Sequence, residues 1–168
     1  MLAAVDLSSF SAASLDEVTG ALRACNAAAS FAPTVAAGRP YPSVDALVAR
    51  AGEVSQALPW DEVAQALAAH PRIGDRVSGD SAEAASSRQE QAAMSTAEDD
   101  VRAALLQGNR DYEARFDHVF LIRAAGRTPA EMLAELRRRL AHSAEQERPE
   151  VLEQLAQITE LRVRGLVS

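Results

Sequence analysis

A histidine stands at a point where the chain must leave a helix. In the stretch AHPRIGDR, residues 69–76, an apolar helical pattern reaches His70 and Pro71 follows at once. Proline has no amide hydrogen and disfavours helical geometry at the residue before it, so a helix ends here. The negative end of the helix dipole favours a protonated imidazole, which can act as a general acid near neutral pH. His70 is therefore a candidate acid–base residue, or else a helix-end histidine that hydrogen-bonds the last carbonyls.

A second candidate is a polar helix face. Ser87, Glu90 and Gln91 stand at positions i, i+3 and i+4, so one face presents a hydroxyl, a carboxylate and an amide side by side. This face could bind a small, polar, planar molecule, or it could be an ordinary solvated surface. Four arginines could bind an anion but are more often surface charges: Arg72, Arg76, Arg123 and Arg162. Arg123 is unusual because it directly follows an apolar run and so requires a partner.

A helical scaffold is expected to position these side chains. Aromatic residues make up 4% of the chain and alanine is abundant, which favours helices over strands. With 168 residues and 48% hydrophobic content, the chain can build one real core. We therefore predict an all-α fold: a single compact multi-helix domain over residues 1–168, with one short buried extended segment near residues 119–124.

Capping signals place most of the expected helices. Ser14 with Glu17 and Ser95 with Glu98 form capping boxes, and Thr128, Pro129 at the first helical position and Glu131 start a further helix. Leu15, Val18 and Leu22 are expected on one face of the first of these helices. Further helices are expected after Ser43, over residues 60–70, within SSRQEQAAM, from Ser95 through Phe116, and along the C-terminal stripe of Val151, Leu155 and Ile158. Val119 to Ile122 is a continuous apolar run without helical period, which indicates a buried extended segment.

Charge and composition exclude several classes of function. The formal net charge of −7 disfavours binding to nucleic acid or to an anionic membrane surface, because both would repel the protein. Cys25 is the only cysteine, so no internal disulfide is possible, and a reducing, cytoplasmic location is expected. No leader, membrane span, zinc-ligand spacing, phosphate loop or dinucleotide fingerprint is apparent. We therefore expect chemistry without a metal or a cofactor.

Several spaced motifs together carry a family resemblance. HPRIGDR, SRQEQ with its glutamate twenty positions after the histidine, NRDYEARF, VFLIRAAGRT and ITELRVRGL occur in this order. In this the chain resembles the 2-oxo-4-hydroxy-4-carboxy-5-ureidoimidazoline (OHCU) decarboxylase family, which performs the last of three steps from urate to allantoin. The resemblance runs over nearly the full chain and implies an all-helical, cofactor-free, homodimeric enzyme that acts on a small ureidoimidazoline.

The resemblance also implies roles for individual residues. His70 would be the catalytic acid–base residue and Glu90 the carboxylate closest to the chemistry. The segment from Phe120 to Ala124 would supply main-chain hydrogen bonds to the substrate. The other implied substrate-binding residues are Pro71, Ser87, Arg88, Gln89, Gln91, Leu121, Ile122, Arg123 and Arg162.

Some positions depart from the family pattern. Many members have Asp-Leu-Ala-Gly after the His-Pro pair, whereas this chain has Arg72 to Asp75, and Ser86 stands where a tryptophan is common. His118 stands where the family often has an aromatic residue, and it could be a second titrating group or a partly exposed loop histidine. The alternative to an enzyme is a helical ligand-binding or interaction module that kept the fold and lost the activity; the presence of both His70 and Glu90 argues against it.

Overall fold

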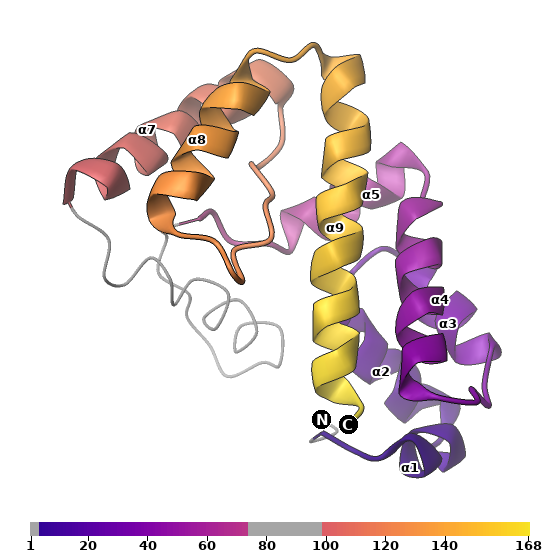
Figure 1. Ribbon diagram of the computed structural model, residues 1–168. Coiled ribbons are helices and arrows are strands. Elements are labelled where there is room, and N and C mark those ends of the chain that lie inside the picture. The colour runs from indigo at the N-terminus through magenta and orange to yellow at the C-terminus, as the bar shows by residue number, and fades with distance from the viewer. Residues whose placement is uncertain (1–3, 74–98) are drawn as a thin grey trace. The chain divides into compact units, whose positions relative to one another are not determined.

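The structure is a computed structural model that describes residues 4–73 and 99–168. Helices make up most of this part of the chain, in the order α1 (Leu7–Ala12), α2 (Leu15–Cys25), α3 (Phe31–Ala37), α4 (Val44–Gln56), α5 (Trp60–Ala68), α7 (Asp99–Phe116), α8 (Pro129–Leu140) and α9 (Ala144–Leu166) (Figure 1). The described residues form no sheet, and their only strand-like pairing is an isolated bridge between Val5 and Val167. The all-α prediction is confirmed.

The helices cluster into two compact units. The first unit comprises Met1–Ala66 with Leu155–Ser168, and the second comprises Leu67–Gln154. The single domain expected over residues 1–168 stays a prediction. Among the helices of residues 4–73 and 99–168, none combines the length and apolar character needed to cross a bilayer.

Local capping chemistry explains where the helices of the first unit begin. The Ser14 hydroxyl accepts the amide of Glu17, whose carboxylate accepts the amide of Ser14, so the predicted capping box of α2 is confirmed. Ser43 caps α4 as predicted, with its hydroxyl accepting the amide of Ala46 at 3.0 Å. Of the three residues expected on one face of α2, Val18 and Leu22 are fully buried, whereas Leu15 is 59% exposed. Leu15 is the first residue of α2, and the inward stripe begins only one turn later, at the fully buried Val18.

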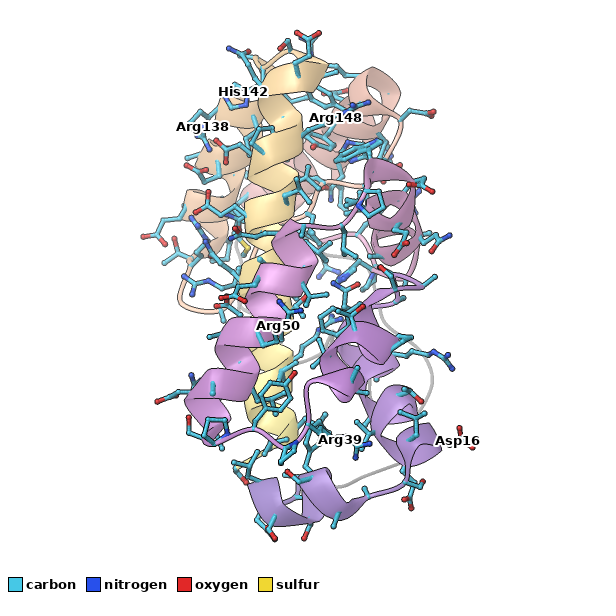
Figure 2. The ribbon with its side chains drawn as sticks, turned by 90° about the vertical axis from the view of Figure 1, so that its right-hand side faces the viewer. Asp16, Arg39, Arg50, Arg138, His142 and Arg148 are labelled. Atoms are coloured by element: carbon cyan, nitrogen blue, oxygen red, sulfur yellow. The ribbon has the colours of Figure 1, made fainter. Side chains whose placement is uncertain are left out.

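Two short helices of the first unit, α1 and α3, were not predicted from the sequence. α1 is capped by Asp6, whose carboxylate accepts the amide of Ser9. Its carboxyl end is held by Arg39, which donates to the carbonyls of Ser11 and Ala13 over 3.3 and 2.8 Å (Figure 2). The amino end of α3 is covered by Glu62, whose carboxylate accepts the amide of Ser30 at 2.9 Å.

A neutral polar cluster lies in the core of the first unit. The Asn26 amide group donates to the hydroxyls of Ser55 (3.3 Å) and Thr159 (3.2 Å), and its oxygen accepts the amide of Ala28 (3.0 Å). We call Asn26, Ser55 and Thr159 the Asn26 cluster. Cys25 is buried beside it in sequence, and burial raises the pKa of its thiol to about 12. The thiol is therefore protonated and unreactive near neutral pH.

The second unit is built on two helices that approach closely. α7 and α8 lie side by side (Figure 1), and Gly108 allows this, because a Cβ at that position would lie 2.4 Å from a methyl carbon of Leu136. α7 runs unbroken through Gly108 and Asn109, as the sequence analysis expected. The core between these helices contains Ile73, Leu105, Tyr112, Phe120, Ile122, Ala124, Met132, Leu133 and Leu136.

The segment that joins α7 to α8 ends in a turn that needs glycine. Gly126 has φ +79°, a left-handed conformation that side chains with a Cβ disfavour. The predicted helix start is confirmed here: Pro129 is the first residue of α8, and Thr128 and Glu131 form a capping box. The capping box predicted at Ser95 and Glu98 lies outside the described residues. α9 begins at Ala144 and contains Pro149 in its second turn.

Candidate functional site

His70 lies just beyond the end of α5. The helix ends at Ala68, and the amide of His70 donates to the carbonyl of Leu67 at 3.0 Å to close the last turn. The predicted helix break before Pro71 is therefore confirmed. The His70 side chain is only 8% exposed, which is unusual for a histidine at a helix end and places it among the buried polar residues.

The turn that carries His70 is fixed to α7. Arg72 pairs with both carboxylate oxygens of Glu113, at 2.5 and 3.0 Å. The Asn109 side-chain amide donates to the carbonyl of Ile73 at 2.8 Å, and the side chain of Ile73 is buried in the core of the second unit. A two-point ion pair and a buried hydrogen bond on consecutive residues leave this turn little freedom. Arg72 thus has a structural partner rather than being a simple surface charge.

Residues 119–124 form the second part of the site. They are not helical, and Phe120, Leu121, Ile122 and Ala124 are each at most 4% exposed, so the predicted buried segment is confirmed in its burial. Phe120, Ile122 and Ala124 belong to the same core cluster as Ile73. The structure therefore brings the His70 turn and this segment, about fifty residues apart in sequence, onto one core within the second unit.

Two side chains bind the backbone of this segment. Arg139 of α8 donates from Nη1 to the carbonyl of Leu121 at 2.7 Å, and the amide of Arg123 donates to Oε1 of Gln154 in α9 at 2.9 Å. Between them, the N–H and C=O of Ile122 make no hydrogen bond to any described residue. These two groups can therefore bind a ligand that offers a carbonyl and an N–H.

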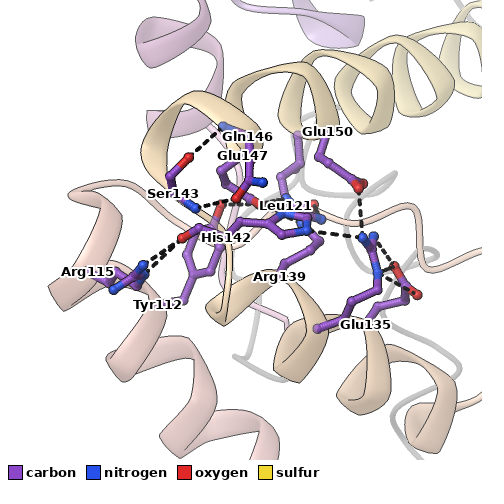
Figure 3. Close-up of polar contacts among 11 residues, drawn as sticks. Tyr112, Arg115, Leu121, Glu135, Arg139, His142, Ser143, Gln146, Glu147 and Glu150 are labelled. Carbon is purple, nitrogen blue, oxygen red and sulfur yellow. Dashed lines mark hydrogen bonds and ion pairs between the residues drawn. The ribbon is translucent and has the colours of Figure 1, made fainter.

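Arg139 is part of a buried charged cluster, shown in Figure 3. Arg139 and Glu147 form an ion pair in which each side chain is 1% exposed, with the arginine Nε donating to Oε1 of Glu147 at 2.6 Å. The same carboxylate accepts the Tyr112 hydroxyl at 2.6 Å and contacts Nδ1 of His142 at 3.0 Å. We call Tyr112, Arg139, His142 and Glu147 the Arg139 cluster. Burial and the hydrogen bond to Glu147 raise the pKa of Tyr112 well above its ordinary value.

The Arg139 cluster was not predicted, although the sequence contains a signal for it. Arg139 follows Met132 by seven positions and Leu136 by three, so it lies on the buried stripe of its helix. Glu147 precedes Val151 by four and Leu155 by eight, again on the inward stripe. A charged residue on such a stripe must be paired, because an isolated buried charge is very costly.

The remaining predicted site residues fall into three groups. The Arg123 side chain is half-buried, and its Nε atom is buried with no hydrogen-bond partner in the described residues. Arg162 is 7% exposed and belongs to the first unit. The predicted helical face lies outside the described residues and comprises Ser87, Arg88, Gln89, Glu90 and Gln91. The structure thus brings together the His70 turn and residues 120–124, and leaves the place of Glu90 a prediction.

His118 precedes the buried segment and is half-buried. Its Nδ1 lies 3.1 Å from the carbonyl of Val119, and its ring meets that of Tyr112 edge-on, with centroids 5.4 Å apart. These contacts make His118 part of the packing around the segment. Within residues 4–73 and 99–168, no group of three or more histidine, cysteine or acidic residues could hold a metal ion.

Comparison with known proteins gives consistent matches. A family model described as OHCU decarboxylase matches residues 11–164. A crystal structure of OHCU decarboxylase in the presence of (S)-allantoin is similar at a TM-score of 0.71 and 25% identity, over 84% of this chain and 92% of the other. A crystal structure of (S)-allantoin synthase has a TM-score of 0.73 at 18% identity; the match covers 97% of this chain and 54% of that one, which shows a shared fold. A search of curated proteins gives no significant match.

Proposed function

The chain belongs to the OHCU decarboxylase family of carboxy-lyases, and we propose that it converts OHCU to (S)-allantoin in urate degradation with His70 as the proton donor. One observation carries the assignment of residues. Ile73, three residues after His70, packs in one core with Phe120 and Ile122, so the buried imidazole and the peptide groups of Ile122 belong to the same unit. An acid and a planar hydrogen-bonding edge are what this reaction requires.

The chemistry needs no external electron sink. In the substrate, the carbon that bears the carboxylate lies next to a ring C=N bond. When the C–C bond breaks and carbon dioxide leaves, the electron pair moves into this conjugated system, and a proton then adds at carbon. The net change is loss of carbon dioxide and gain of one proton. The same sink that a cofactor provides in other decarboxylases is built into the substrate.

His70 supplies that proton in this proposal. An imidazole at a helix end is biased toward its protonated form, and a charged Glu90 beside it would strengthen the bias. Delivery to one face of the ring fixes the product as the S enantiomer. A positioned acid of this kind contributes a factor of about 10²–10⁴ in rate. Orientation and desolvation of the substrate carboxylate would supply the rest.

The substrate is held by backbone and side-chain groups. The N–H and C=O of Ile122 face the ureide or the ring amide, which offers the matching carbonyl and N–H. The other proposed contacts come from Pro71, Ser87, Arg88, Gln89, Gln91, Phe120, Leu121, Arg123, Ala124 and Arg162. A homodimer and a cytoplasmic location, expected from the resemblance and the cysteine content, complete the proposal.

The experiment uses freshly made substrate, generated from urate by urate oxidase and hydroxyisourate hydrolase. Circular dichroism follows the appearance of (S)-allantoin, because spontaneous decay yields racemic product. The protein should accelerate loss of carbon dioxide and give an optically active product, and the rate should survive EDTA. Racemic product at the spontaneous rate would instead identify a non-catalytic module with the same fold.

Arg162 can be tested against a neighbour. Arg162→Lys should weaken turnover because Arg162 is buried and proposed to bind substrate, whereas Arg164→Lys should not, since Arg164 is an exposed residue paired with Asp45 at 2.9 Å. Steady-state kinetics of both variants provide the comparison. Equal rates for Arg162→Lys and wild type would remove Arg162 from the binding site.

A further inference from the structure

We propose that Arg139 and Gln154 are positioning residues for this reaction, because together they orient the N–H and the C=O of Ile122. The inference rests on the proposed function, in which residues 120–124 bind the substrate. Neither side chain needs to touch the substrate. Each acts through a peptide group of the segment.

The geometry of the peptide bond links these side chains to Ile122. A peptide unit is planar, and in its trans form the C=O of one residue and the N–H of the next point in opposite directions. The carbonyl of Leu121 and the N–H of Ile122 belong to one such plane, so Arg139, at 2.7 Å from that carbonyl, sets the direction of the N–H. The carbonyl of Ile122 and the N–H of Arg123 form the next plane, so Gln154, at 2.9 Å, sets the direction of the carbonyl.

Two consecutive peptide planes are thus bound on one edge and unpaired on the other. The unpaired edge offers one donor and one acceptor on the same residue, Ile122. This pair matches a ligand edge in which a C=O and an N–H are adjacent, such as a ureide or a cyclic amide. A small rotation of either plane would misalign one of the two hydrogen bonds with the ligand, because hydrogen bonds weaken steeply as they bend.

The Arg139 guanidinium is itself held in place, which a positioning role requires. Glu147 accepts from Nε at 2.6 Å, and the carboxylate is in turn fixed by the Tyr112 hydroxyl at 2.6 Å (Figure 3). The guanidinium carbon lies 4.7 Å from the centre of the Phe120 ring, so the group also packs on the side chain before Leu121. With one edge occupied by Glu147, the planar group can present Nη1 to Leu121 in only one orientation.

The main test compares Arg139→Lys with Tyr112→Phe. Lysine can keep the ion pair with Glu147 but lacks the second, fixed donor for the Leu121 carbonyl. KM should therefore rise about tenfold, while kcat should change less than threefold. This is the pattern expected when a hydrogen bond that stabilises the bound substrate and the transition state equally is lost. The dissociation constant of (S)-allantoin should rise by the same factor. Tyr112→Phe removes one hydrogen bond to Glu147 but leaves this carboxylate paired with Arg139 and with Nδ1 of His142. These two contacts should keep the guanidinium in place, so KM should stay unchanged.

Gln154 gives an independent pair of variants. Gln154→Leu removes the acceptor for the Arg123 amide and should raise KM by a similar factor, whereas Gln154→Glu keeps an acceptor oxygen and should restore KM to near the wild-type value. Amide hydrogen exchange at Arg123 should be faster in Gln154→Leu, which loses the acceptor of this amide, and unchanged in Tyr112→Phe. This readout requires no turnover, so it tests the positioning role even if the decarboxylase assignment fails.

Two results would overturn the inference. One is a fall in kcat with unchanged KM in Arg139→Lys, which would indicate an interaction made only in the transition state rather than the orientation of a group that binds the substrate. The other is an equal rise of KM in Tyr112→Phe, which would trace the effect to general loosening of the cluster rather than to the Leu121 carbonyl.

Discussion

The two compact units each bury a polar cluster, but the clusters differ in charge and in what they hold. The Asn26 cluster of the first unit is neutral, and its side chains connect helices and the turn that follows α2. The Arg139 cluster of the second unit contains a full ion pair with both partners 1% exposed. Arg139 of this cluster also donates a hydrogen bond to the carbonyl of Leu121, which lies in a non-helical segment. The charged cluster lies where a non-helical segment has to be held.

This difference indicates what each cluster does. The neutral side-chain amide of Asn26 can form hydrogen bonds with buried hydroxyls at little electrostatic cost. Such a cluster suits a unit whose core consists of packed helices. A buried ion pair is costly to desolvate and often adds no net stability over apolar residues. Its presence in the second unit is therefore better explained by the fixed direction that a guanidinium gives to a carbonyl than by stability.

The largest expected effect is on the charged cluster. Arg139→Met leaves the Glu147 carboxylate buried without its cation and should lower the free energy of unfolding by about 3–5 kcal/mol. The double variant with Glu147→Gln removes the stranded charge, keeps an acceptor for Tyr112 and should recover most of the loss. Urea denaturation of both variants measures this. If the single variant is as stable as wild type, the pair is not buried as described.

The neutral cluster should respond less. Asn26→Leu leaves the amide of Ala28 without its acceptor and should cost about 1–3 kcal/mol by the same denaturation measurement. A loss larger than that of Arg139→Met would reverse the comparison between the units.

One buried group in each unit should lower the free energy of unfolding at alkaline pH, and the two groups should begin to do so at different pH values. The folded-state pKa of Tyr112 lies above the unfolded value of about 10, so the stability it contributes is present below pH 10 and is lost as the pH rises past it. The slope is at most about 1.4 kcal/mol per pH unit. For Cys25, whose pKa is raised from 9.0 to about 12, the loss begins near pH 9.

Two variants assign these slopes. Tyr112→Phe should flatten the loss of stability above pH 10, and Cys25→Ala should flatten the part that begins near pH 9. Unfolding free energies measured from pH 8 to 11 provide the curves. If Tyr112→Phe loses stability with pH as the wild type does, the Tyr112 hydroxyl of the wild type is not buried against Glu147.

The smallest effects come from two glycines, one in each unit, with opposite signs. Gly126→Ala strains a left-handed residue and should destabilise by about 1 kcal/mol. Gly20 lies on the exposed side of α2, where an added Cβ would meet nothing within 4 Å, so Gly20→Ala should stabilise by about 0.5–1 kcal/mol. Thermal unfolding of both variants checks the signs; a stabilised Gly126→Ala would contradict the turn geometry.

Features that depend on neighbouring residues could be predicted from the sequence. The capping box at Ser14, the helix start at Pro129 and the helix break at Pro71 are local chemistry, and all three are confirmed. The buried run from Val119 was likewise recognisable from its lack of helical period. α1 was missed because six residues are too few to show a period, and its capping Asp6 is a common residue in loops as well.

The tertiary arrangement of the site could be predicted only in part. RRRL presents three successive arginines, and composition does not distinguish the buried Arg139 from the exposed Arg137 and Arg138; only the stripe that begins at Met132 does so. The partner of Arg139 lies on another helix, and a single sequence contains no rule that pairs it with Glu147. The same holds for Asn109 and the carbonyl of Ile73.

The central claim is that His70 gives its proton to one face of the decarboxylated ring. The most direct measurement follows the circular dichroism of allantoin formed from fresh OHCU with wild-type protein and with His70→Ala, after far-UV spectra have shown equal helix content. Wild type should give (S)-allantoin faster than spontaneous decay, and His70→Ala should give racemic product at the spontaneous rate. Enantioselective turnover by His70→Ala would contradict the account.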